Sequence, residues 1–348
     1  MWCGPRGIPL YGPSGASVHL RGIARAFADR GHTVRVFTPN ADDDRGRWDA
    51  DPAIPASHLE PGAWSPGLRT VGARLDGHRS AAALARWRPD LVWERHDPMT
   101  LAVGRWCRAL GIPRWVELDA PLSLERRWPD PPRPWEHARE VHNLRSADRV
   151  FAVSRWLVRW GTSIGCARVH HLPNGITAGP PGDRGKVRRR LGLDGPVVGF
   201  VGSMHRWHGA DRLPALLDAL GPDWTGVAVG DGTHPPARHR RLIAVGHVSH
   251  RAVADHVAAL DVGVAPYATG APPWFCPLKV SAYRAEGVPA VTTATEDAAA
   301  LVGETGAVVD DDAPAAWADA VRRVADQPRI AYVRTWHDVV DEALAVSG

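Results

Sequence analysis

The rarest basic residue in the chain marks the first candidate site. Lysine and arginine together number 42, yet only Lys186 and Lys279 are lysines. Lys279 follows a proline-bounded apolar turn, residues 273–277, and lies in a segment that reads as a helix ending at Gly287. Backbone N–H groups at a helix N-terminus, together with a compact ammonium, suit a phosphate. A solvated lysine at an ordinary helix start fits equally well, so the segment alone leaves both interpretations open.

A second group of chemically capable side chains follows two strands of the first half. Residues 91–93 read as a buried strand that leads to His96, and residues 114–118 read as the next strand, which carries Glu117 and leads to Asp119. Ligands of open α/β sheets bind at the carboxyl ends of the strands, so we expect these three side chains to meet there. They are candidates for orienting a substrate or moving a proton, and the sequence does not rank them.

A third group lies between a strand and a helix of the second half. Residues 197–201 form a continuous apolar strand, and a helix is expected over residues 211–220. The loop between them contains Arg206 and His208, two side chains that suit a pyrophosphate.

Strands and helices alternate along both halves, which predicts two α/β domains with parallel sheets. In the first half, a loop containing Gly12 and Gly15 leads into a helix and a strand, although only residues 1–4 are available for the strand before it. The linker-like stretch TAGPPGDRG spans residues 177–185. We therefore expect an N-terminal domain at 1–176, a C-terminal domain at 186–329, and a final helix, 330–346, within a segment (330–348) that returns to the N-terminal domain.

Composition narrows the class of protein. The chain has 348 residues, 23% charged residues, a formal net charge of +4 and a pI near 9.1. The arginines are interleaved with acids, so small anions explain the basic bias as well as nucleic acid would, and we expect no nucleic-acid partner. Four scattered cysteines indicate neither a disulfide framework nor a zinc site. No apolar stretch is long enough for a membrane span or a signal peptide, so we expect a cytoplasmic protein.

Six stretches, taken together and in order, resemble the retaining glycosyltransferases of family 4, which have the GT-B fold. They are GIPLYGPSGASVHLRGIARAFADRGHTVRV, VWERHDPMTLA, GIPRWVELDAPL, HHLPNG, VVGFVGSMHRWHG and FCPLKVSAYRAEGVPAV. The resemblance covers most of the chain and implies two Rossmann-like domains that face each other across a cleft.

The resemblance also implies roles for individual residues. It places the donor nucleotide sugar against these positions: Gly12, Gly15, Ser203, Arg206, His208, Gly230, His247, Val248, Cys276, Pro277, Leu278, Lys279 and Ala282. It places Asp119 where many members carry a histidine near the reacting sugar. The catalytic candidates remain Asp119, His96 and Glu117, with no metal and no cofactor.

Two departures from the family pattern bear on activity. The family typically carries two glutamates eight residues apart around the Pro-Leu-Lys, and here Trp274 and Ala282 occupy those positions. The second glutamate binds the donor ribose in the family, and a methyl group cannot replace a carboxylate. Glu286, one turn further along, is the one nearby acid to consider as a substitute.

The sequence thus predicts a glycosyltransferase that moves a sugar from a nucleotide-diphosphate sugar to a small soluble acceptor, with retention and in specialised metabolism. The competing hypothesis is a catalytically degenerate sugar-nucleotide binder or partner subunit, which Ala282 motivates. An NAD-dependent oxidoreductase is disfavoured because the chain lacks G-x-G-x-x-G. The base, sugar, acceptor and oligomeric state are open.

Overall fold

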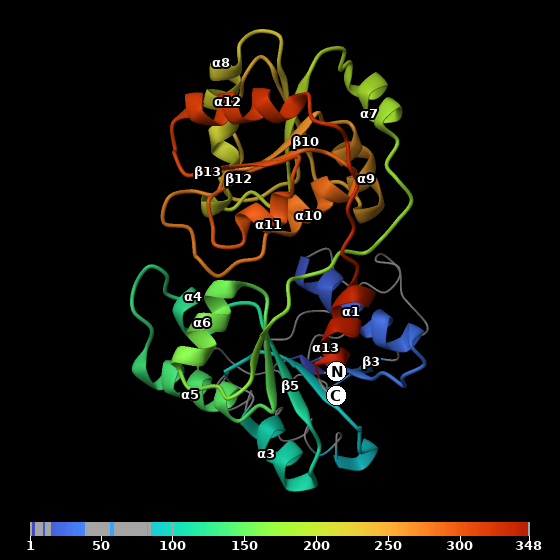
Figure 1. Cartoon of the computed structure of the whole chain (residues 1–348), viewed down its shortest axis with the longest axis vertical. Helices are drawn as coiled ribbons and strands as arrows, with labels where there is room; N and C mark the ends of the chain where they lie inside the picture. The colour runs from blue at the N-terminus through green and yellow to red at the C-terminus, as the bar shows by residue number, and fades with distance from the viewer. Residues whose placement is uncertain are drawn as a thin grey trace. The chain divides into compact units, whose positions relative to one another are not determined.

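The computed structural model describes residues 2–3, 10, 15–38, 56–58, 82, 85–98 and 101–346. The chain divides into two compact units. The N-terminal unit contains Met1–Thr177, Trp274–Cys276 and Thr335–Gly348, and the C-terminal unit contains Ala178–Pro273 and Pro277–Arg334. Figure 1 shows the elements of each unit. Gly12 and most of the segment 39–84 lie outside the described residues.

The N-terminal unit is built on a parallel sheet. In the described residues it has seven strands in the order β3-β2-β1-β4-β5-β6-β7. The strands are β1 (Trp2–Cys3), β2 (Val36–Thr38), β3 (Ala56–His58), β4 (Val92–Arg95), β5 (Arg114–Leu118), β6 (Arg149–Ala152) and β7 (Val169–His171). The helices are α1 (Gly15–Asp29), α3 (Leu101–Leu110), α4 (Leu122–Glu125), α5 (Pro134–Arg145), α6 (Arg155–Ser163) and α13 (Trp336–Ala345). The short strand before the glycine loop is β1, which pairs with both β2 and β4.

One face of this sheet is covered by α1 and α13. Alternate residues of the strands place Trp93, Trp115 and Phe151 in one buried cluster with Ile23 of α1 and Val340 of α13. Because side chains alternate along β5, Glu117 lies on the same face as Trp115, and Val116 and Leu118 lie on the other. Glu117 therefore points toward α1.

The C-terminal unit repeats the architecture. Within the described residues its parallel sheet has six strands in the order β10-β9-β8-β11-β12-β13. The strands are β8 (Val197–Val201), β9 (Thr225–Val229), β10 (Leu242–Gly246), β11 (Val262–Ala265), β12 (Ala290–Thr293) and β13 (Ala307–Val309). The helices are α7 (Arg184–Leu191), η1 (Arg206–His208), η2 (Ala210–Arg212), α8 (Leu213–Leu220), α9 (His250–Ala258), α10 (Leu278–Ala285), α11 (Ala298–Val302) and α12 (Pro314–Ala325).

Helices on both faces bury the apolar strands of this sheet. The leucines of α8 and the apolar face of α12 pack with Val198, Phe200 and Val264 in one cluster. Helices α10 and α11 lie on the other side of the sheet in Figure 1. Tyr283 of α10 is fully buried there, where its ring lies over Gly263 and its hydroxyl donates to the carbonyl of Val264, 3.1 Å away. The α/β fold predicted from the alternation is confirmed in both units.

Three boundaries differ from the expectation. The final helix begins at Trp336 rather than at residue 330, because Thr335 and Asp338 form a capping box and the Tyr332 N–H bonds to the Arg284 carbonyl. Helix α7 begins at Arg184, inside the expected linker. Trp274–Cys276 groups with the N-terminal unit instead of the donor domain, since Trp274 is buried against Trp128 and Trp156, and Ser154 donates to its carbonyl.

Candidate functional site

The acidic edge of the N-terminal unit lies at the carboxyl ends of β4 and β5. These two strands pair in parallel, with Arg95 opposite Glu117, and the His96 N–H donates to the Glu117 carbonyl, 2.9 Å away. Asp119 follows β5 directly. The three predicted catalytic residues are thus brought to one edge of the sheet, but their surroundings differ.

Glu117 is buried and fully engaged. One carboxylate oxygen is 2.5 Å from Nε2 of His19 on α1, and the other is 3.4 Å from the indole nitrogen of Trp93. Burial acts to raise the pKa of Glu117, but the charge and hydrogen bond of His19, with help from Arg95, hold the pKa below its usual range. Glu117 is therefore a fixed anion behind the surface rather than a group that meets a substrate.

Asp119 is the exposed member of the group. Its side chain is 22% exposed, against 4% for Glu117. The Arg95 guanidinium is 3.0 Å from its Oδ2, and Nδ1 of His19 is 3.7 Å from its Oδ1. Burial raises the pKa of Asp119 above its usual range, with the Arg95 charge opposing this effect and the Glu117 charge adding to it. Of the three candidates, Asp119 is the one placed to reach a substrate.

His96 belongs to a buried network that joins β4 to α4 and α5. Its Nε2 is 2.9 Å from Glu140, which also accepts hydrogen bonds from the backbone N–H and the hydroxyl of Ser123. Burial acts to raise the pKa of Glu140, but its hydrogen bond to His96 and the His96 charge hold the pKa below the usual range. His96 is 6% exposed, so its contacts describe a structural ion pair.

A metal ion is one alternative use of this edge. His19, Glu117 and Asp119 each offer one ligand atom, and these atoms lie within 4.8 Å of one another. Arg95 and His19 already supply cationic partners to the two carboxylates, so the group is electrostatically complete with protein side chains alone. The expectation of a metal-independent reaction stays a prediction.

Lys279 occupies the second position of α10 in the C-terminal unit. Its Nζ is buried 4.0 Å from the ring centre of Phe200 and 4.9 Å from that of Tyr267, and it has no hydrogen-bond partner among the described residues. The stem of the side chain is half-buried, while the ammonium itself is covered. Burial lowers the pKa of Lys279 to about 7. An anion next to this nitrogen would restore its charge.

Glycines let the loops after β8 and β9 approach Lys279 and each other. A side chain at Gly202, whose φ is +131°, would meet Cε of Lys279 at 3.4 Å. A side chain at Gly230, whose φ is +118°, would lie 2.1 Å from the Gly202 carbonyl oxygen. The positive φ favours glycine at both positions, and at Gly230 the space also excludes a side chain.

The loop after β8 supplies the other predicted phosphate ligands. Ser203 and Arg206 are exposed, whereas His208 is half-buried and its ring contacts Trp207 and Tyr267. Nδ1 of His208 donates to the Ser203 carbonyl. Burial, together with the charge of Lys279, lowers the pKa of His208 to about 4. His208 is therefore neutral near pH 7 in the free protein, and the positive charge expected there comes from Arg206 and Lys279.

The remaining donor-site candidates are spread over several elements. Pro277 is the N-cap residue of α10, Leu278 is its first residue, and Ala282 lies one turn beyond Lys279. His247 and Val248 follow β10, and Gly15 is the exposed first residue of α1. Cys276 groups with the N-terminal unit.

Glu286 accepts the Gly182 N–H at 2.9 Å, so it is already engaged and does not stand in for the carboxylate that Ala282 lacks.

Two residues of this edge, His19 and Arg95, were not among the candidates selected from the sequence. His19 lies on the buried face of α1 with Leu20, Ile23 and Phe27, and a titratable residue within an apolar stripe is a readable signal. Arg95 ends β4 beside residues that we did select. Neither partner of His19 could be read from local spacing, because Glu117 is 98 residues away.

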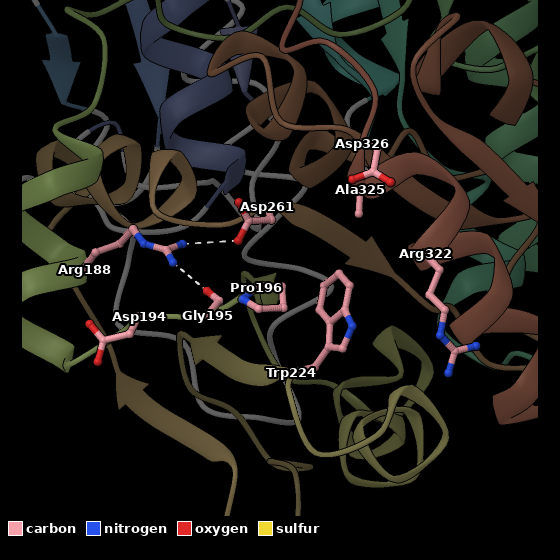
Figure 2. Close-up of a pocket in the computed structure, with 9 residues that line it drawn as sticks. All are labelled: Arg188, Asp194, Gly195, Pro196, Trp224, Asp261, Arg322, Ala325 and Asp326. Carbon is pink, nitrogen blue, oxygen red and sulfur yellow. Dashed lines mark hydrogen bonds and ion pairs between the residues drawn. The ribbon is translucent and has the colours of Figure 1, made fainter.

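A separate pocket of about 530 Å³ lies at the opposite edge of the C-terminal sheet, where β8, β9 and β11 begin (Figure 2). Its basic side chains are engaged with protein groups: Arg188 bonds to Asp261 and to the Gly195 carbonyl, and Arg322 bonds to the Ala219 carbonyl. Parallel sheets bind ligands at their carboxyl ends, so we assign no function to this pocket.

Family models match both halves of the chain. The model for Glycosyltransferase Family 4 matches residues 13–179, and the model for Glycosyl transferases group 1 matches residues 195–327. A D-inositol 3-phosphate glycosyltransferase from Xylanimonas cellulosilytica is 27% identical over 88% of this chain and 82% of the relative. An alpha-D-kanosaminyltransferase from Streptomyces kanamyceticus is 26% identical over 77% of this chain and 75% of the relative.

Solved structures share the architecture. A sucrose-phosphate synthase from Thermosynechococcus elongatus superposes with a TM-score of 0.72 at 20% identity, over 99% of this chain and 93% of that one. HepE from Anabaena, solved in complex with UDP, superposes with a TM-score of 0.72 at 18% identity, over 99% of both chains. None of the helices in the described ranges has both the length and the apolar composition that a bilayer crossing requires. The chain belongs to the group 1 glycosyltransferases of family 4 and has their GT-B fold, with two Rossmann-like units.

Proposed function

We propose that this chain transfers a sugar from a nucleotide-diphosphate sugar to a small soluble acceptor, with retention of configuration. The observation that carries the proposal is the buried ammonium of Lys279, which has no hydrogen-bond partner among the described residues. An uncompensated buried cation is costly, and a diphosphate is the anion that this family handles. Both curated relatives act on sugars, and one is named for inositol 3-phosphate, a small polar acceptor.

The residues of the C-terminal unit suit the leaving group. Negative charge develops on the diphosphate as its bond to the sugar breaks, and Lys279, Arg206 and the N-terminal amides of α10 are placed at the carboxyl end of the sheet to stabilise that charge. We assign neither carboxylate as a nucleophile, because Glu117 is buried against His19 and Asp119 is paired with Arg95. The acceptor hydroxyl then attacks the face of the sugar from which the diphosphate leaves. An oxygen of the leaving diphosphate takes up the proton of that hydroxyl.

Asp119 has the second role in the proposal. Its partly exposed carboxylate orients a hydroxyl of the acceptor or the donor sugar, while Arg95 holds it in place. We further propose action in specialised metabolism, which the likeness to a kanosaminyltransferase supports. A cytoplasmic location stays a prediction.

One observation favours a second candidate function, a sugar-nucleotide binder without turnover. Ala282 supplies no carboxylate for a ribose, and Glu286 is already bonded to the Gly182 N–H. Such a protein would serve as the partner of an active subunit.

Purified protein separates the two functions. Thermal-shift screening against UDP, GDP, ADP and dTDP selects the base, and the sugar nucleotides of that base are then incubated with a panel of polar acceptors. Nucleotide release that depends on an acceptor supports the transferase, and the anomeric proton coupling of the product reports retention. Saturable nucleotide binding with no release supports the binder, and absence of binding contradicts both.

A further inference from the structure

His19 lies between the two acids of the N-terminal unit, and the proposed mechanism does not yet use it. Its Nε2 is 2.5 Å from Glu117, and its Nδ1 is 3.7 Å from Asp119. The histidine is 2% exposed, so it meets these acids in a setting with little solvent screening.

The ring of His19 is held on a third side by the C-terminal helix of the same unit. The indole of Trp336 stacks on it with ring centres 4.4 Å apart and an interplanar angle of 28°. Gly22, one turn along α1, makes room for this stack, because a Cβ there would lie 2.1 Å from the indole.

These contacts fix which ring nitrogen faces which acid. The hydrogen bond to Glu117, whose pKa is held low, keeps a proton on Nε2 and sets the ring orientation. Nδ1 is then directed to Asp119, the exposed acid. Arg95 holds the other oxygen of the same carboxylate, so Asp119 is fixed from two directions. One polar atom of each of Glu117, His19 and Asp119 lies within 4.8 Å of those of the other two.

We propose that His19 is a positioning residue: Glu117 holds the imidazole, and the imidazole holds the Asp119 carboxylate in the orientation that meets the substrate. This inference rests on the proposed function, because it assigns Asp119 a role in transfer. It also gives the buried Glu117 a role beneath the edge, where it holds His19 and its charge adds to the raised pKa of Asp119.

A double-mutant cycle tests the inference. The amide of His19→Gln can reach the Glu117 oxygen that Nε2 now reaches, but it places no imidazole nitrogen beside Asp119. We expect this variant to fold and to lose about 100-fold in kcat, the scale for a misplaced reacting group. We expect the KM for the nucleotide sugar to stay unchanged. The double variant His19→Gln/Asp119→Asn should be no slower than Asp119→Asn alone. A folded His19→Gln with wild-type kcat, or losses that multiply, would overturn the inference.

A second measurement does not depend on turnover. The ¹⁵N resonances of the His19 imidazole, assigned in the wild-type protein through their connection to the His19 backbone, should show a protonated Nε2, and their pH titration should shift in Asp119→Asn. Unchanged resonances in Asp119→Asn would overturn the inference even if the single variant failed to fold. If the wild-type protein transfers no sugar, the proposed function fails, while this titration still decides whether His19 and Asp119 are coupled.

Discussion

The two units treat their buried charges in opposite ways. In the N-terminal unit, Glu117 and Asp119 lie beside His19 and Arg95, so each anion has a cationic neighbour within the protein. In the C-terminal unit, the ammonium of Lys279 faces the rings of Phe200 and Tyr267 and has no hydrogen-bond partner in the described residues.

The difference indicates which unit is complete without a ligand. In a well-bonded buried ion pair, each charge is compensated by its partner. A lone buried charge loses its hydration and has no opposite charge or hydrogen bond to replace it. Burial accordingly leaves the pKa of Lys279 at about 7, while Glu117 keeps its charge. The N-terminal edge is preorganised, and under the proposed function an anion that arrives with the substrate completes the C-terminal site.

The largest expected effect comes from removing the unpaired charge. Lys279→Met should lower kcat/KM for the nucleotide sugar by about 100- to 1,000-fold, because one group that stabilises the leaving diphosphate is lost. The matched control is Lys186→Met, since Lys186 is exposed and pairs with Asp255 at 2.8 Å. The control should change the rate by less than about twofold. Equal losses in the two variants would erase the contrast between the units.

The next effect concerns the preorganised edge. Asp119→Asn should lower kcat by about 100-fold, since it removes the one partly exposed carboxylate among the candidates. The dissociation constant for the nucleotide should not change, because Lys279 and Arg206, the proposed cationic contacts to the diphosphate, lie in the other unit. Asp130→Asn, at an exposed turn, is the control. A variant that loses nucleotide affinity rather than rate would contradict the assignment of Asp119.

A smaller effect tests how the edge is held. Gly22→Ala should lower the free energy of unfolding by about 1–3 kcal/mol, because the added methyl overlaps the Trp336 indole. Gly185→Ala, also helical, meets only the end of the Arg189 side chain and should be neutral or stabilising. Urea titration of both variants makes the comparison. Equal stability of the two would show that the stack of Trp336 on His19 is loose.

The smallest expected effect restores a missing acid. Ala282→Glu should tighten nucleotide binding by about tenfold if the pocket still accommodates a ribose, because a carboxylate gains charge-assisted hydrogen bonds. Ala315→Glu, on the exposed side of α12, is the control for added negative charge. Calorimetric titration gives both constants. Weaker binding in Ala282→Glu alone would mean that this turn of α10 serves another purpose.

Much of the fold could be predicted from local patterns in the sequence. The continuous apolar runs predicted β5 at Arg114–Leu118 and β8 at Val197–Val201 with the bounds that the structure has. The same reasoning extended the last helix too far, since its start is set by the Thr335 capping box and by a hydrogen bond from Tyr332 to Arg284. The hydrophobic periodicity of a segment does not show where a capping box starts the helix.

The site was predicted less completely than the fold. Asp119 could be selected because parallel sheets place the ends of their strands together, and Lys279 because it is one of two lysines and lies at a helix N-terminus. The ranking of Asp119 over Glu117 and His96 needed burial and partners, and the role of His19 needed a contact across 98 residues. The neutral state of His208 also followed from burial and from the nearby charge of Lys279, which sequence spacing does not contain.

The central claim is that a bound diphosphate restores and compensates the positive charge of Lys279. Because the pKa of free Lys279 is about 7, the side chain is mostly neutral at pH 8, and an adjacent diphosphate should raise its pKa and restore the proton. Calorimetric titration at pH 8 with the nucleoside diphosphate chosen by thermal shift, repeated in buffers of different ionisation enthalpy, counts the protons taken up. We predict an uptake of about one proton in the wild-type protein and none in Lys279→Met. Binding without proton uptake, or uptake that persists in Lys279→Met, would contradict the claim.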